Sequence, residues 1–148
     1  MKGKRNRKDV QEFGRYLMSN IIALHQELAS GTYRHGGYEH FRINDPKQRE
    51  IHKASVRDRL VHHALYRKLY PFFDQTFIFD SYSCREGRGT HKALDRFRLY
   101  ASRALGDSAN IVWVLKCDIR KFFASIDQQI LIAFLKRKLP DMRTVALL

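Results

Sequence analysis

The stretch IVWVLKCDIRKFFASID, residues 111–127, places one carboxylate at the end of an apolar run. Residues 111–115 are continuous β-forming residues, which predicts a strand buried on both faces. Asp118 follows, just before the chain turns toward a helix. A carboxylate held at a sheet edge can bind a hard cation such as Mg²⁺ together with substrate phosphates. The alternative is an Asp that pairs with Arg120 or Lys121, or that caps the following turn.

Apolar spacing elsewhere predicts four helices. Apolar residues recur three or four positions apart over residues 10–28, 55–69, 90–105 and 126–135. Gly31 is expected to end the first of these helices, and Pro71 the second. Ser55 and Asp58 have the spacing of a capping box at the start of the second helix.

Between the first two helices, aromatic residues alternate with glycine and polar residues over residues 32–43. This pattern predicts a short hairpin that turns at Gly36-Gly37, with another turn at Asp45-Pro46 before a returning strand. Helices, a small hairpin and then a buried strand leading into a helix make the fold class α+β. Because a single buried strand needs sheet neighbours for its backbone groups, we expect this sequence to be cut off inside a domain.

The chain is strongly basic. Its 148 residues contain 28 Lys and Arg against 15 Asp and Glu, a formal net charge of +13. Such a surplus favours a polyanionic partner, with nucleic acid as the first candidate. The alternative is a basic solvated face without a specific partner.

The cysteines, the histidines and the hydropathy of the sequence argue against a disulfide-rich, a zinc-binding and a membrane-spanning protein. Cys84 and Cys117 are the two cysteines, and no disulfide framework surrounds them, which favours a reducing cytoplasm. No apolar stretch approaches the roughly 20 residues of a membrane span, so we expect no membrane partner. A zinc site is disfavoured, because His62 and His63 are adjacent and cannot share one helical face, and Cys84, His91 and Cys117 lack ligand spacing.

Two stretches carry a family resemblance. DIRKFFASID, residues 118–127, resembles motif A of reverse transcriptases: an Asp, a hydrophobic residue, two variable positions, an aromatic pair and a Ser-Ile step. The stretch 42–94 is similar to the preceding fingers and early palm blocks in order and spacing. It contains DRLVHHAL, then PFFD, then SYSCREGRGTHKAL. The resemblance covers roughly residues 11–140 and is closest to the bacterial retron-type, group II intron-like and diversity-generating retroelement enzymes.

The resemblance implies roles around the carboxylate. Asp118 is similar to the first catalytic, metal-binding Asp, and Ile119 to the residue whose backbone carbonyl faces the second metal ion. Phe123 resembles the steric gate that leaves no room for a 2′-hydroxyl, although Phe122 and Phe123 could also both be core residues.

The resemblance also implies which cations bind the substrates. Arg49 matches the fingers arginine that grips the triphosphate, with Lys47 or Arg42 as its companion; the alternative for Arg49 is a surface base. In the glycine-rich loop, the residues expected to contact template or primer phosphates are Arg85, Gly87, Arg88 and Gly89. A loop with helix-capping glycines is the other interpretation of that segment.

The predicted organisation is a basic N-terminal arm over residues 1–10, mostly helical fingers and early palm blocks over 11–110, and a truncated start of the palm over 111–148. In reverse transcriptases the acidic pair that complements the first Asp lies in a later Y-x-D-D hairpin, and this sequence has no two adjacent acidic residues. The resemblance therefore implies the N-terminal fragment of an RNA-directed DNA polymerase, inactive alone. Mg²⁺ would bind only with the missing palm carboxylates.

Expected partners are an RNA template, a DNA primer, a deoxynucleoside triphosphate and the remaining C-terminal polymerase part. A non-catalytic module or polymerase remnant that binds RNA or single-stranded DNA is the alternative. A third possibility is self-association through an exposed strand edge.

Overall fold

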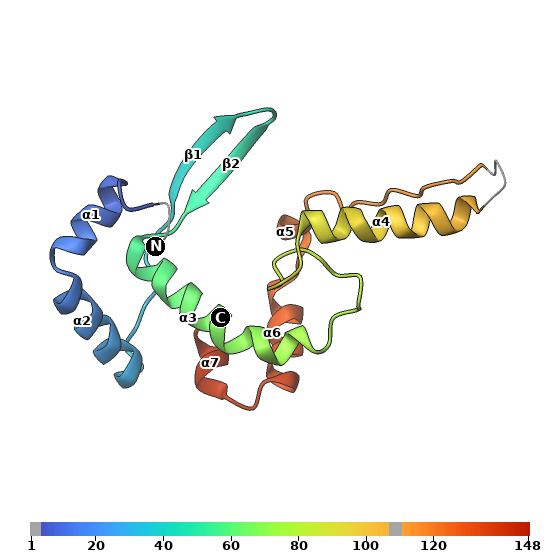
Figure 1. Ribbon diagram of the computed structural model, residues 1–148. Coiled ribbons are helices and arrows are strands. Elements are labelled where there is room, and N and C mark those ends of the chain that lie inside the picture. The colour runs from blue at the N-terminus through green and yellow to red at the C-terminus, as the bar shows by residue number, and fades with distance from the viewer. Residues whose placement is uncertain (1–3, 107–110) are drawn as a thin grey trace. The chain divides into compact units, whose positions relative to one another are not determined.

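The computed structural model describes residues 4–106 and 111–148 and confirms the α+β fold class (Figure 1). The chain divides into two compact units, Met1–Phe73 and Asp74–Leu148. The described elements, in chain order, are α1 (Lys8–Arg15), α2 (Leu17–Ser30), β1 (Glu39–Asn44), β2 (Gln48–Lys53), α3 (Val56–Asp74), α4 (Thr90–Leu105), α5 (Phe122–Ser125), α6 (Gln128–Lys138) and α7 (Met142–Ala146). Residues 1–3 of the predicted basic arm and residues 107–110 lie outside the described ranges, and the predicted ranges 1–10, 11–110 and 111–148 stay predictions.

The predicted first helix is two helices. The backbone leaves helical geometry at Tyr16, with φ −120° and ψ 39°, so α1 and α2 are separate. The Asn20 amide donates to the carbonyl of Phe13 at 2.9 Å and satisfies a group next to this break. Gly31 ends α2 as predicted: its φ of +72° is a left-handed conformation that glycine adopts without steric cost.

The hairpin forms, but the predicted turn at Gly36-Gly37 is wrong. Strands β1 and β2 pair antiparallel, with Asn44 opposite Gln48, so the chain turns over residues 45–47 (Figure 1). Gly36 precedes β1 and is engaged elsewhere, because its N–H donates to a carboxylate oxygen of Asp58 at 3.2 Å. In Figure 1 the hairpin projects away from the helices of its own unit.

Asp58 organises the first unit from a position where its side chain is only 1% exposed. Its carboxylate accepts hydrogen bonds from the hydroxyls of Tyr33 (2.8 Å) and Ser55 (2.7 Å) and from the guanidinium of Arg57 (3.1 Å), besides the Gly36 N–H. Ser55 also accepts from the Asp58 N–H at 3.1 Å, which is the Ser55 half of the predicted capping box. The Asp58 carboxylate accepts from the Ser55 hydroxyl. Burial by itself raises the pKa of Asp58, but the bonds from Ser55, Tyr33 and Gly36 outweigh it and hold the pKa below its ordinary value.

Two further ion-pair clusters connect the elements of this unit. Arg57 binds the carboxylate of Glu27 and so joins α3 to α2. Asp9 of α1 accepts from Arg59 at 2.9 Å and lies 3.2 Å from the ammonium of Lys53. Burial tends to raise the pKa of Asp9, but these two cations lower it to about 2. The apolar core beneath these pairs includes Val10, Leu24, Tyr33, Ala54, Val56 and Val61.

Pro71 does not end the second predicted helix. Helix α3 continues through it to Asp74. A proline inside a helix removes one N–H donor and crowds the preceding turn, but it does not by itself forbid helical backbone on both sides.

In the second unit, the predicted buried strand over residues 111–115 is wrong. Residues 111–119 are not part of a strand, and their side chains are exposed, with Trp113 at 90%. A strand buried on both faces needs hydrogen-bonded neighbours, and the described residues of this unit contain no strand to supply them. The predicted fourth helix is present as α6, whose N-cap is Asp127: the carboxylate accepts from the N–H groups of Gln129 and Ile130.

We predict that Gly36→Ala destabilises the first unit and that Gly37→Ala does not. A Cβ on Gly36 would lie 3.0 Å from Oδ2 of Asp58, whose carboxylate four donors hold in place, whereas a Cβ on Gly37 meets nothing within 4 Å. Urea unfolding followed by circular dichroism should show a loss of roughly 1–2 kcal/mol for Gly36→Ala. Gly37→Ala should change the free energy of unfolding by less than about 0.5 kcal/mol. Equal effects would show that the carboxylate is not fixed.

Candidate nucleic-acid interface

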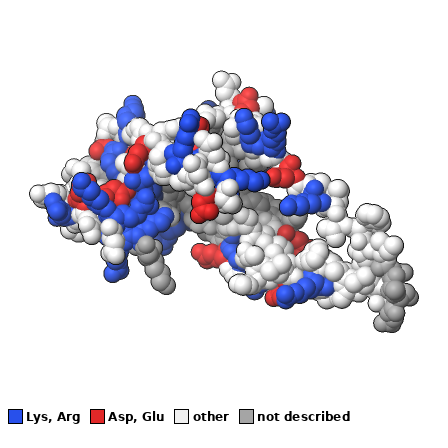
Figure 2. Space-filling model, turned by 90° about the horizontal axis from the view of Figure 1, so that it is seen from above, with Lys and Arg blue, Asp and Glu red and all other residues white. Residues whose placement is uncertain are grey.

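The residues predicted to bind nucleotide or nucleic acid form three groups. Arg42, Lys47 and Arg49 lie on the hairpin of the first unit. The glycine-rich loop before α4 and the segment around Asp118 belong to the second unit, and each group is defined within its own unit. Figure 2 shows lysine and arginine side chains prominent on the visible face, with acidic groups between them.

The hairpin separates its two arginines. Arg42 lies opposite Glu50 in the ladder and binds it at 3.1 Å, whereas Arg49 lies opposite Ile43. Because side chains alternate along a strand, Arg42 and Arg49 lie on opposite faces of the hairpin. Within the described residues neither Arg49 nor Lys47 has a carboxylate partner. The geometry therefore favours Lys47 over Arg42 as the companion cation of Arg49.

Arg85 holds the loop between α3 and α4 together. Its guanidinium donates to the Asp74 carboxylate at 2.6 Å, to the Asp74 carbonyl at 3.2 Å and to the Ile78 carbonyl at 3.2 Å, and it lies over the Phe77 ring. The side chain is 9% exposed. These bonds give Arg85 a structural task, and its contact with phosphates stays a prediction, because phosphate binding would have to replace them.

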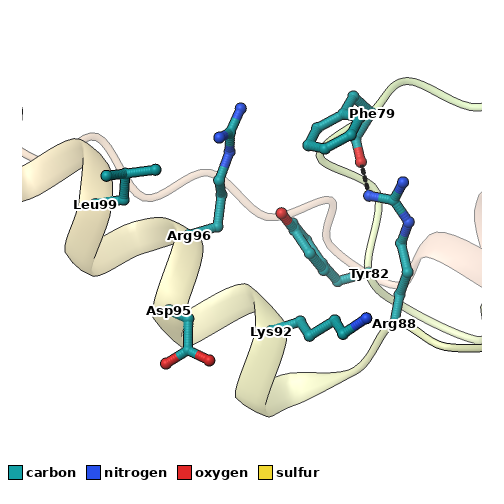
Figure 3. A pocket seen from close by; sticks show the side chains of 7 residues that line it. All are labelled: Phe79, Tyr82, Arg88, Lys92, Asp95, Arg96 and Leu99. Atoms are coloured by element: carbon teal, nitrogen blue, oxygen red, sulfur yellow. Dashed lines mark hydrogen bonds between the residues drawn. The ribbon is translucent and has the colours of Figure 1, made fainter.

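Arg88 lies in an open pocket of about 380 Å³ at the start of α4 (Figure 3). Its guanidinium donates to the Phe79 carbonyl and lies 4.5 Å from the centroid of the Phe79 ring. Gly87, with φ +65°, lets the loop turn just before Arg88. The residues lining the pocket are Phe79, Tyr82, Arg88, Lys92, Asp95, Arg96 and Leu99. Three cations and two aromatic rings around one cavity suit phosphates and unpaired bases.

Asp80 fixes the wall beside this pocket. Its carboxylate accepts from the hydroxyls of Tyr100 (2.8 Å) and Tyr82 (2.9 Å) and from Arg96 (3.0 Å). The hydrogen bond from Tyr100, followed by those from Tyr82 and Arg96, lowers the pKa of Asp80. Burial, then the bond to Asp80, raises the pKa of Tyr82. Sequence reasoning missed this cluster, although Arg96 and Tyr100 are four residues apart on one helix and so share a face.

The motif around Asp118 is exposed. Asp118 and Ile119 lie at the end of the extended segment 111–119, and α5 begins three residues later. Phe123 of α5 is 88% exposed, and its ring meets that of Phe122 edge to face at 5.2 Å between centroids. Neither phenylalanine is a core residue here, so the ring of Phe123 is accessible to a ligand.

The described residues do not complete a magnesium site at Asp118. Among them, Asp118 belongs to no group of three His, Cys, Asp or Glu side chains whose ligand atoms converge. Mg²⁺ binds through several oxygen ligands with near-octahedral geometry, which one exposed carboxylate cannot provide. Among the described residues, Asp118 therefore offers one side-chain carboxylate to a magnesium ion, and further carboxylates would have to come from elsewhere.

Comparison with known proteins shows distant similarity to an intron maturase. The chain is 26% identical over 99 residues to nuclear intron maturase 1, mitochondrial, of Arabidopsis thaliana; the match covers 67% of this chain and 13% of the maturase. It is 27% identical over 134 residues to protein YkfC of Escherichia coli (strain K12), which covers 89% of this chain and 35% of YkfC. The chain thus spans about a third of YkfC and a smaller part of the maturase. No established protein-family pattern matches it. None of the described helices combines the length and the apolar character needed to cross a bilayer.

We predict that Arg85→Lys opens the loop of residues 74–89, because a lysine cannot reproduce the forked hydrogen bonds of a guanidinium. Trypsin cleaves after both residues, so the substitution preserves every cleavage site. Limited trypsin digestion should show cleavage in this loop about tenfold faster, which corresponds to roughly 1.4 kcal/mol. Arg98→Lys is the control, because Arg98 is exposed and its one ion pair within the described residues is with its helical neighbour Asp95. This substitution should leave the rate unchanged. An unchanged cleavage rate for Arg85→Lys would contradict the structural task of Arg85 and favour its predicted contact with phosphates.

Proposed function

We propose that this chain is the fingers and early palm portion of an RNA-directed DNA polymerase of the reverse transcriptase class. The observation that carries the proposal is the ordered series of motifs from Arg42 to Asp118, which follows the order of such enzymes. The distant similarity to an intron maturase supports it and suggests a reverse-transcriptase-related origin. The catalytic activity of a complete protein, its RNA template and its DNA primer are part of this proposal.

The hairpin is the proposed contact for the triphosphate of a deoxynucleotide. Arg49 is exposed and unpaired by carboxylates within the described residues, and a guanidinium can donate two parallel hydrogen bonds to phosphate oxygens. Lys47 in the adjoining turn adds a second positive charge. The ladder places Arg49 opposite Ile43, and Lys47 lies in the turn that joins the two strands, so both charges are presented from one hairpin.

The pocket at the start of α4 is the proposed contact for template or primer. Arg88 and Lys92 would bind backbone phosphates, and the rings of Phe79 and Tyr82 offer faces on which bases stack. Gly87 and Gly89 allow a close approach of the sugar–phosphate chain. The net charge of +13 supplies a general attraction to such a polyanion.

Asp118 and Phe123 are the proposed polymerase residues of the second unit. Asp118 would provide one carboxylate ligand to Mg²⁺, Ile119 its backbone carbonyl, and Phe123 a bulky ring that disfavours a 2′-hydroxyl on the incoming sugar. The exposed ring of Phe123 is compatible with contact to a ligand.

A non-catalytic module that binds RNA or single-stranded DNA is the second candidate. The aromatic and basic pocket favours it, because stacking faces and cations alone are sufficient for sequence-tolerant binding. The two candidates differ in whether a matching deoxynucleotide strengthens the complex.

We predict that the matching deoxynucleoside triphosphate tightens binding to an RNA-template/DNA-primer hybrid and that Arg49→Gln removes this gain. Loss of a charge-assisted contact to phosphate should cost about tenfold or more in the nucleotide-dependent affinity. Fluorescence anisotropy of a labelled hybrid, with and without the nucleotide, measures both affinities. Without the nucleotide, the affinity of Arg49→Gln for the hybrid should fall only by the small amount expected from the loss of one positive charge.

Lys136→Gln is the matched control, because it removes one positive charge from the exposed last turn of α6. It should preserve the gain from the nucleotide. Absence of any nucleotide effect in the unmodified chain would contradict the polymerase proposal and favour the binding module. Equal behaviour of Arg49→Gln and Lys136→Gln would reduce the role of Arg49 to net charge.

A further inference from the structure

The register of the hairpin brings two histidines together from opposite strands. His40 of β1 is the direct partner of His52 of β2, and their Nε2 atoms are 2.9 Å apart. Glu50 is two residues before His52 on the same strand, so its side chain lies on the same face. The ligand atoms of His40, Glu50 and His52 all lie within 4.8 Å of one another. Three metal-ligating side chains thus converge on one face of a two-stranded ladder.

We propose that His40, Glu50 and His52 form a binding site for a divalent transition-metal ion, with Zn²⁺ as the best-fitting ion. Zinc holds histidine nitrogens at about 2.0–2.1 Å in tetrahedral geometry, which places ligand atoms about 3.3–3.4 Å apart. The two Nε2 atoms therefore need to separate by only about half an ångström, and exposed side chains can adjust by that amount. Two imidazoles and one carboxylate leave a fourth position open for water or another ligand.

The ligand chemistry distinguishes this site from a magnesium site. Imidazole nitrogen suits zinc, copper and nickel, whereas Mg²⁺ takes oxygen ligands and gives up its water reluctantly. The site shares no residue with the proposed magnesium ligands Asp118 and Ile119. The proposed zinc site does not depend on the proposed polymerase function, and each proposal is tested by its own experiment.

Two neighbours shape the site. The rings of Tyr38 and His52 are nearly perpendicular, with centroids 6.4 Å apart and planes at 81°, and this contact restricts the orientation of the imidazole. Arg42 binds the Glu50 carboxylate at 3.1 Å and therefore competes with a metal ion for this carboxylate. Metal binding would weaken this pair, so the metal and the charge on Arg42 are coupled through Glu50.

The alternative without metal is a hydrogen bond between the two imidazoles. One ring then donates through its Nε2–H and the other accepts. Such a pair on an exposed surface contributes little to stability, since water offers equivalent partners. In this alternative, the ion pair with Arg42 is what holds the Glu50 side chain in place. Removing Arg42 separates the two interpretations, because it frees a metal ligand but has no direct effect on a histidine pair.

The test is Zn²⁺ titration of the 148-residue chain by isothermal calorimetry, without a polyhistidine tag. We expect one site whose affinity falls at least tenfold in His52→Gln. The same substitution at His25, an exposed residue of α2, should leave the affinity unchanged. Arg42→Gln should tighten Zn²⁺ binding, because it removes the competing cation. Titration with Mg²⁺ should produce no binding at these residues.

Co²⁺ provides a readout that does not depend on stability. Its visible absorption reports the ligand geometry, and a tetrahedral spectrum should form with the unmodified chain and be lost in His52→Gln, while circular dichroism confirms that the variant is folded. His35 and His62 form another pair, with Nε2 atoms 3.2 Å apart, and His62→Gln should not affect the spectrum. Equal Zn²⁺ affinities for His52→Gln and His25→Gln, or loss of the site in His62→Gln alone, would overturn the proposal.

Discussion

Ionised Asp58 is the constraint on which the first unit depends. Burying a carboxylate is costly unless donors surround it, and here Tyr33, Gly36, Ser55 and Arg57 provide them. These donors come from both sides of the hairpin in the sequence: Tyr33 and Gly36 precede β1, and Ser55 follows β2. The carboxylate therefore fixes both ends of the hairpin next to the start of α3, and the residues carried on the two strands are positioned by it.

This arrangement divides the basic residues into two groups that net charge alone does not distinguish. Arg57, Arg59 and Arg85 use their guanidinium groups to hold carboxylates or carbonyls of their own unit. Arg49 and Lys47 have no such carboxylate within the described residues, so their charges are available to a phosphate. The hairpin is thus the part of the first unit where structural and ligand-binding tasks separate most clearly, and the proposed zinc ligands lie on the face that carries Arg42.

Local signals in the sequence were sufficient where one short segment decides the structure. Gly31 ends a helix because its own backbone adopts a left-handed conformation, and Ser55 caps a helix through a residue three positions away. The turn at Asp45-Pro46 was predicted and joins the two strands. The turn predicted at Gly36-Gly37 was wrong because Gly36 is committed to Asp58, a partner 22 residues away. The prediction of a strand over residues 111–115 was wrong. Apolar composition shows only that burial would be favourable, whereas a strand also needs neighbouring strands to bond its backbone groups. The pair of His40 and His52 was not predicted, because the two side chains are brought together by the register of the β1–β2 ladder.

The most direct measurement is NMR of the arginine side-chain Nε–Hε groups during addition of an RNA/DNA hybrid and its matching deoxynucleotide. Each signal is assigned by the loss of one resonance in an arginine-to-lysine variant. If the hairpin cations bind the nucleotide, the signal of Arg49 shifts when the nucleotide is added, whereas the signals of Arg57 and Arg59 stay in place because their partners do not change. An unmoved Arg49 signal, or equal shifts of all three, would contradict a nucleotide site on the hairpin.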